Sequence, residues 1–66
     1  MFIVQWTNKH SGEQGFVKCL HTKDKYFENT FVRDEAKRFK SGAKASILGT
    51  LAKYCEQNTY EAVAAE

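Results

Sequence analysis

The stretch SGAKASILGTLAKYCEQN, from Ser41 to Asn58, decides how the chain folds. Its apolar residues recur at three- and four-residue spacing, which is typical of a helix with one buried face. Ser41 is a suitable N-cap, because its hydroxyl can accept a hydrogen bond from a first-turn N–H that lacks a partner. Asn58 suits the left-handed position that closes a helix. The pattern predicts a helix over residues 42–57, with an apolar stripe made of Ile47, Leu48, Leu51, Tyr54 and Cys55.

The segments on either side of this stretch are short and rich in β-branched and aromatic residues, as strands are. Residues 2–7 and 15–21 flank a polar loop with two glycines, which predicts an antiparallel hairpin. Residues 26–32 form a third, weaker strand, and residues 59–64 can form a fourth.

In the remaining segment, residues 33–40, a single turn is predicted over residues 34–36 and an extended approach to the helix over residues 37–40, with Phe39 as a hydrophobic staple. The predicted helix would be about 24 Å long and a seven-residue strand about 23 Å, so one helix can lie along one face of the sheet. We therefore predict an α+β fold in the order β-β-β-α-β. A three- or four-stranded antiparallel sheet is covered on one face by a single helix.

The composition predicts one small domain over residues 1–66. A chain of this length buries only about 60% of its unfolded surface, so its stability rests on a thin margin of packing. Its net charge of +2 is too small to indicate nucleic-acid binding on its own. The apolar run Phe2-Ile3-Val4 is too short for a signal peptide or a membrane span, so we expect a cytoplasmic protein with reduced thiols and no membrane contact.

The segment Glu35-Ala36-Lys37-Arg38-Phe39-Lys40-Ser41, followed by a helix and a last strand containing tyrosine, resembles a pattern in many small phage and prophage proteins of unknown function. Those chains pair an N-terminal hairpin with an acidic-x-x-Ala-x-x-Phe-x-Ser approach to a helix. This chain departs from them in the helix, where Gly42, Ala45 and Gly49 replace a run rich in Lys and Glu. The resemblance implies the fold and a phage or mobile-element origin, and it implies no catalytic residue.

The soft metal ligands of the chain are two cysteines and two histidines: His10, Cys19, His21 and Cys55. Structural zinc sites usually present close Cys pairs and a His pair, and this spacing does not. We expect two buried thiols and two surface histidines, with no metal, no cofactor and no disulfide. Chains this short rarely enclose a pocket large enough for a substrate, so we do not expect an enzyme.

The basic side chains of the 33–44 segment are the best concentration of positive charge. They could contact phosphate near the helix start, where free N–H groups add partial positive charge. The alternative, which we favour, is a solvated rim that Asp34 and Glu35 partly neutralise. The candidate nucleic-acid-binding residues are Arg33, Lys37, Arg38 and Lys40, with Lys44 beside them.

Large apolar residues occur on both faces of the predicted strands, whereas one helix covers one face only. The uncovered face would form a protein-binding or dimer surface anchored by Trp6, Phe16 and Tyr26, unless flanking loops and lysine stems cover it. We expect a non-enzymatic phage-type accessory protein that acts by protein–protein binding or self-association, such as an inhibitor of a host factor. The alternative is a weak nucleic-acid-binding module.

Overall fold

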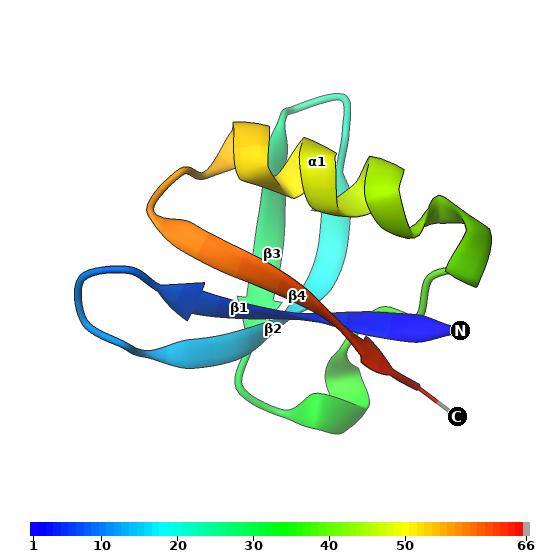
Figure 1. Ribbon diagram of the computed structural model, residues 1–66, viewed down its shortest axis with the longest axis horizontal. Helices are drawn as coiled ribbons and strands as arrows, with labels where there is room; N and C mark the ends of the chain where they lie inside the picture. Colours follow the sequence, from blue (N-terminus) through cyan, green and yellow to red (C-terminus); the bar gives the residue numbers. More distant parts are fainter. Residues whose placement is uncertain (66) are drawn as a thin grey trace.

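The computed structural model describes residues 1–65 and contains a four-stranded antiparallel sheet with one α-helix lying across it (Figure 1). The strands are β1 (Phe2–Asn8), β2 (Gln14–His21), β3 (Tyr26–Thr30) and β4 (Asn58–Ala64), and their order in the sheet is β3-β2-β1-β4. Two 3₁₀ turns, η1 (Arg33–Glu35) and η2 (Ser41–Ala43), precede the helix α1 (Lys44–Tyr54). The predicted α+β fold and the element order are confirmed, and the segment around residues 59–64 is indeed a strand.

The loop between β1 and β2 is ordered by side-chain hydrogen bonds and by a glycine with a positive φ. Asn8 Oδ1 accepts hydrogen bonds from the N–H groups of His10 and Ser11, each at 2.9 Å. Gly12 has a φ of 76°, a left-handed conformation that glycine adopts without steric cost. The polar loop predicted between the first two strands therefore has a defined structure that sets their pairing.

The sheet opens between β1 and β2. β1 pairs with β4 along its whole length but with β2 only at Gln5, Trp6 and Thr7. Part of the gap is filled by the segment before η2, where Phe2 and Phe39 exchange backbone hydrogen bonds of 2.8 and 2.9 Å. Because the two pairs of strands diverge here, the β2–β3 hairpin runs across β1 and β4 (Figure 1).

The core lies between the sheet and α1. Leu51 is the buried residue of α1, and it has no exposed surface. Phe39 is also buried and stacks on Phe2 with ring centroids 5.5 Å apart. The buried cluster consists of Phe2, Val4, Trp6, Val17, Phe39 and Leu51, with Leu20, Phe27, Ile47, Leu48, Tyr60 and Ala62 packed against it.

The predicted helix ends need correction. α1 spans Lys44–Tyr54 rather than residues 42–57, and the chain before it forms the tighter turn η2. Ser41 lies inside η2, and the N-cap of α1 is Ala43, which makes no side-chain capping bond. Asn58 does not close the helix, because it pairs with Asn8 in the sheet. The helix ends earlier because Cys55 is extended, with a φ of −146°.

A β-bulge between Val17 and Cys19 changes which side chains of β2 face the core. Strict alternation predicts that Val17 and Leu20 point to opposite faces, yet both contact the core. Cys19 and His21 lie on the other side of β2 from Leu20, because strand side chains alternate. Strict alternation along the sequence would place Val17 and Cys19 on the same face of β2, but the bulge puts them on opposite faces.

Candidate functional site

The turn that follows β3 carries the most exposed apolar pair among residues 1–65. Phe31 is 63% exposed and Val32 is 51% exposed. We call these two residues the Phe31–Val32 turn. Isolated exposed apolar residues are common on protein surfaces, but two large ones side by side on a small domain are less so.

Hydrogen bonds from a buried threonine hold this turn in one conformation. Thr30 Oγ1 accepts from the Val32 N–H at 3.1 Å and donates to Glu35 Oε1 at 2.8 Å. The Glu35 N–H in turn donates to the Val32 carbonyl oxygen at 3.0 Å. These contacts link both ends of the Phe31–Val32 turn to η1, so its two apolar side chains are presented by an ordered backbone.

Trp6 lies behind this turn, not on an exposed face. Only 4% of Trp6 is exposed, and its ring meets the Phe31 ring edge to face with centroids 5.9 Å apart. Its Nε1 donates to the Phe16 carbonyl oxygen at 3.3 Å. The prediction that Trp6 is a surface anchor is therefore wrong. Trp6 shares a strand face with Phe2 and Val4, and that face is the one that packs in the core.

The other two predicted anchors lie apart from each other. Phe16 is half-buried, and the Arg33 guanidinium sits over its ring at 6.0 Å from the centroid. Tyr26 is 47% exposed and begins β3, at the opposite end of that strand from the Phe31–Val32 turn. It stacks on His21 with ring centroids 4.5 Å apart. The three predicted residues thus do not form one continuous patch.

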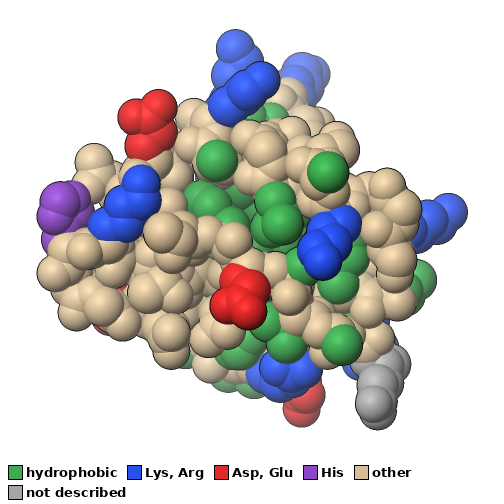
Figure 2. Space-filling model, viewed as in Figure 1, with side chains coloured by type: hydrophobic (Ala, Val, Ile, Leu, Met, Phe, Trp, Pro, Cys, Tyr) green, Lys and Arg blue, Asp and Glu red, His purple; other side chains and the backbone are tan. Residues whose placement is uncertain are grey.

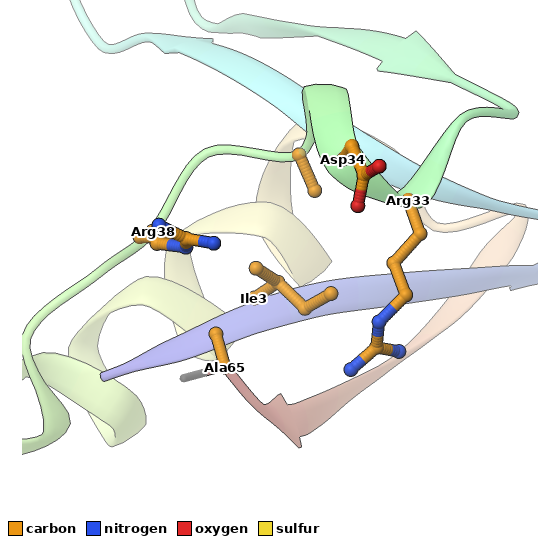
Figure 3. Close-up of a pocket in the computed structure, with 6 residues that line it drawn as sticks. Ile3, Arg33, Asp34, Arg38 and Ala65 are labelled. Atoms are coloured by element: carbon orange, nitrogen blue, oxygen red, sulfur yellow. The ribbon is translucent and has the colours of Figure 1, made fainter.

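The four candidate nucleic-acid residues are only partly brought together. Arg33 and Arg38 line one hollow of about 60 Å³, with Ile3, Asp34 and Ala65 beside them (Figure 3). Arg33 also donates to the Ala64 carbonyl oxygen at 3.0 Å.

The two lysines of that set lie elsewhere. Lys37 Nζ lies over the Phe39 ring at 5.9 Å, and Lys40 immediately precedes η2. Neither lysine lines the hollow that holds the two arginines. The result is a two-arginine hollow with an aspartate in it, not a continuous basic stripe.

A larger hollow of about 260 Å³ lies between the start of α1 and the end of β4. Figure 2 shows hydrophobic side chains exposed on this face of the molecule, between α1 and β4, with basic side chains around them. The residues lining the hollow are Met1, Phe2, Ser41, Lys44, Ala62, Val63 and Ala64. Both hollows are smaller than the roughly 300–1,000 Å³ of typical small-molecule pockets.

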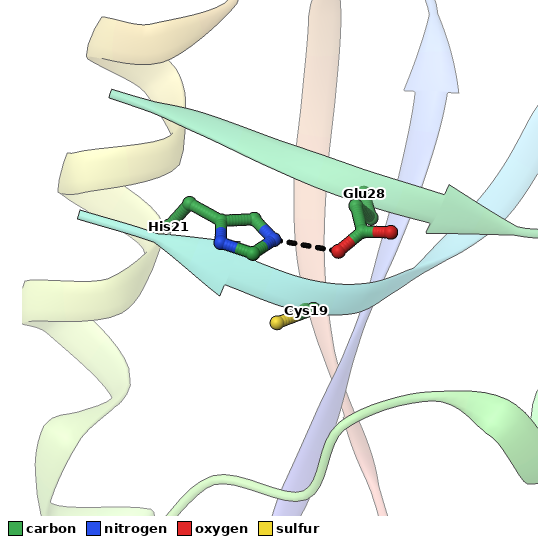
Figure 4. Close-up of side chains that lie close together, drawn as sticks. All are labelled: Cys19, His21 and Glu28. Carbon is green, nitrogen blue, oxygen red and sulfur yellow. Dashed lines mark hydrogen bonds and ion pairs between the residues drawn. The ribbon is translucent and has the colours of Figure 1, made fainter. Parts of the chain in front are cut away.

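Three potential metal ligands gather on the β2–β3 hairpin: Cys19, His21 and Glu28 (Figure 4). Cys19 and His21 are among the soft ligands named from the sequence, but Glu28 is not, because nothing local to Glu28 marks it as their partner. The pairing of β2 with β3 supplies that information, since it sets Cys19 directly opposite Glu28. Cys55, near the end of α1, does not belong to this group.

Comparison with known proteins adds no relative to this description. No protein-family model matches the chain, and neither a curated protein nor a solved structure matches it. Among residues 1–65, no helix combines the length and the apolar character needed to cross a membrane. Any function must therefore be argued from the surfaces described above.

Proposed function

We propose that this protein is a non-enzymatic protein-binding domain, and that the Phe31–Val32 turn inserts into an apolar pocket of a partner protein. The observation that supports the proposal is the exposure of two adjacent large apolar side chains on a hydrogen-bonded turn. Burying an exposed side chain of this size contributes about 1.5–3 kcal/mol. Two such anchors can carry much of the free energy of a specific contact.

The ordered backbone of the turn favours binding in a second way. A partner that binds a flexible loop must also fix its conformation, which costs free energy. Here Thr30 and Glu35 already fix the Phe31–Val32 turn before any partner arrives. The contact therefore needs little reorganisation of this chain.

The partner that fits best is a different protein whose apolar pocket has an acidic rim. The exposed basic residues Arg33, Lys37 and Arg38 follow the turn directly, and two acidic residues between them offset only part of their charge. A symmetric dimer needs a surface that is complementary to itself. Two side chains that project from a turn fit a pocket better than they fit a second copy of themselves. The phage-type accessory role suggested by the resemblance is consistent with such a partner in the host cell.

Affinity capture from a bacterial lysate tests this proposal with matched variants. The native protein should retain a binding partner, and Phe31→Asp should lose it while keeping the native circular dichroism spectrum. Tyr26→Asp is the control, because Tyr26 is also a large exposed side chain but lies at the far end of β3. Loss of the partner with Tyr26→Asp and retention with Phe31→Asp would contradict the proposed surface. If the native protein sediments as a dimer and Phe31→Asp dissociates that dimer, the partner is a second copy of this chain.

Nucleic-acid binding is the second candidate function. Its support is the placement of Arg33 and Arg38 around one hollow, where two guanidinium groups could hold a phosphate. Against it, Asp34 lines the same hollow, and Arg33 already binds the Ala64 carbonyl oxygen. We rank it below protein binding for these reasons.

A further inference from the structure

The β2–β3 hairpin brings a thiol, an imidazole and a carboxylate to one place. The potential ligand atoms of Cys19, His21 and Glu28 all lie within 4.8 Å of one another (Figure 4). His21 Nε2 and Glu28 Oε2 are in direct contact at 2.5 Å. Cys19 and His21 are both partly buried, so the cluster is not simply a set of fully solvated side chains.

Backbone pairing explains why these three side chains converge. Cys19 and His21 are two residues apart on β2, so their side chains point to the same face. Glu28 is the cross-strand partner of Cys19 on β3, and directly paired side chains share a face. The bulge after Val17 leaves Cys19 and His21 on the face away from the core residue Leu20.

Two further contacts hold the cluster in place. Tyr26, the cross-strand partner of His21, stacks on the imidazole with an interplanar angle of 14°. Beyond His21, the Thr22 carbonyl oxygen accepts a hydrogen bond from the Tyr54 hydroxyl at 3.3 Å, which ties the end of the hairpin to α1. All three ligand residues stand on paired strands, which position side chains more rigidly than loops do.

The donor set matches zinc in both chemistry and scale. Zn²⁺ is commonly bound by Cys sulfur, His nitrogen and Glu oxygen in tetrahedral geometry. At the usual bond lengths the ligand atoms of such a site are about 3.3–3.6 Å apart. The His21 and Glu28 atoms would separate by somewhat less than 1 Å from their present contact, and the Cys19 sulfur, which lies within 4.8 Å of both, would have to reach this spacing too.

We propose that Cys19, His21 and Glu28 form a three-ligand Zn²⁺ site. Three protein ligands leave one coordination position open, which water or a group from another molecule would fill. The site shares no residue with the Phe31–Val32 turn, which follows β3, whereas Glu28 lies in the middle of that strand. The simpler reading of the same geometry is a surface ion pair between His21 and Glu28, with a thiol nearby that takes no part.

Titration of the reduced protein with Co²⁺ distinguishes the two readings, because Co²⁺ replaces Zn²⁺ at tetrahedral sites and reports its ligands by absorption. We expect one equivalent of Co²⁺ to bind, giving visible bands of tetrahedral cobalt and a near-ultraviolet charge-transfer band from thiolate to cobalt. Added Zn²⁺ should remove both signals in a one-to-one ratio.

Variants assign the signal to its residues. Cys19→Ser should abolish the charge-transfer band. Glu28→Gln should weaken metal binding by about tenfold or more, because losing even a residue that only hydrogen-bonds a metal ligand commonly lowers metal affinity 10–100-fold. Because Glu28 is exposed, we expect Glu28→Gln to fold, so this variant keeps the test informative if Cys19→Ser does not fold. Cys55→Ser and His10→Ala are the matched controls and should bind as the native protein does. Absence of binding by the native protein, or a charge-transfer band that Cys55→Ser removes and Cys19→Ser retains, would overturn the proposal.

Discussion

Phe27 of β3 and Tyr60 of β4 meet edge to face, with ring centroids 5.9 Å apart, although their strands are the opposite edges of the sheet. The sheet therefore curls until its two edges approach each other, and α1 contacts both of them. The Tyr60 hydroxyl lies within this closure and donates to the Cys55 carbonyl oxygen at 2.9 Å. A single phenol thus links both edges of the sheet to the end of the helix.

The titration of Tyr60 should make the fold sensitive to alkali. Desolvation by burial raises the pKa of Tyr60 from 10.0 to about 12, and the hydrogen bond from Asn58 lowers it by less than burial raises it. The folded state therefore binds this proton more tightly than the unfolded state does, and its contribution to stability is fully present below pH 10. That contribution should be lost as the pH rises from 10 to about 12. Unfolding midpoints in urea across this range should fall for the native protein and fall less for Tyr60→Phe.

Gly15 should be irreplaceable by alanine. A Cβ atom at Gly15 would lie 2.5 Å from Cζ2 of the buried Trp6 ring, so the indole would have to move. Such overpacking costs roughly 1–3 kcal/mol. Gly15→Ala should lower the melting temperature and shift tryptophan fluorescence to the red as Trp6 becomes solvated.

Gly49 is the matched control for Gly15. It lies inside α1 with open space where a Cβ would be added, and alanine is the better helix former. Gly49→Ala should therefore stabilise the protein by about 0.5–1 kcal/mol. Equal effects of the two substitutions would contradict the close contact between Gly15 and Trp6.

Leu51 should be the most important residue of the helix for stability. It is fully buried, and it belongs to the same core cluster as Val4 and Val17. Leu51→Ala should cost about 2–5 kcal/mol through lost transfer free energy and a residual cavity. Thermal or urea unfolding measures this cost. A native-like melting temperature would mean that α1 does not rest on the sheet as described.

Thr30 should affect both stability and partner binding. Thr30→Val keeps the shape of the side chain but removes the hydroxyl that bonds the Val32 N–H and Glu35. We expect a loss of about 1–2 kcal/mol in stability. Affinity for the captured partner should also fall, although neither Phe31 nor Val32 has changed. Unaltered affinity would show that the order of the turn does not contribute to binding.

Salt dependence tests the nucleic-acid alternative. Neutral replacements of Arg33, Lys37, Arg38 and Lys40 should weaken partner capture but not abolish it, because exposed charges at the rim of an interface contribute less than its apolar anchors. We expect no submicromolar affinity of the native protein for DNA or RNA near physiological salt. Phosphate contacts would instead give an affinity that falls steeply with salt and a slope that flattens in the neutral variant. Observing that slope would reverse our ranking of the two functions.

The coarse fold was readable from the sequence because strong local patterns carried it. The apolar spacing around Leu51 located the helix, and the β-branched and aromatic runs located the first three strands, while the alanine-rich residues 59–64 were only a possible fourth. The helix ends were misread because Ser41 and Asn58 have suitable side chains for caps but are used by a 3₁₀ turn and by the sheet. Capping preference is a local property, and pairing with Asn8, 50 residues away, outweighed it.

The candidate sites were harder to predict because each depends on contacts between distant segments. Trp6 was expected on the surface. The alternation of side chains along a strand shows which residues share a face of the sheet, but it does not show which of the two faces the helix covers. Glu28 joined Cys19 and His21 only through the register of β2 and β3. Phe31 and Val32 looked like the end of a strand. Their exposure follows from the way Thr30 and Glu35 turn the chain.

The pairing of β1 with β4 constrains how the chain can fold as it is synthesised. β1 is made first, but along Phe2 to Val4 it pairs with β4 at Ala62 to Ala64 and not with β2. Contacts between segments so far apart in sequence form late, because the chain must first lose the conformational entropy of the long loop that joins them. A growing chain can form the β2–β3 hairpin early, while the apolar side chains of β1 stay without their partner strand until translation has passed β4. The pairing of Phe2 to Val4 is therefore completed only after β4 has been synthesised.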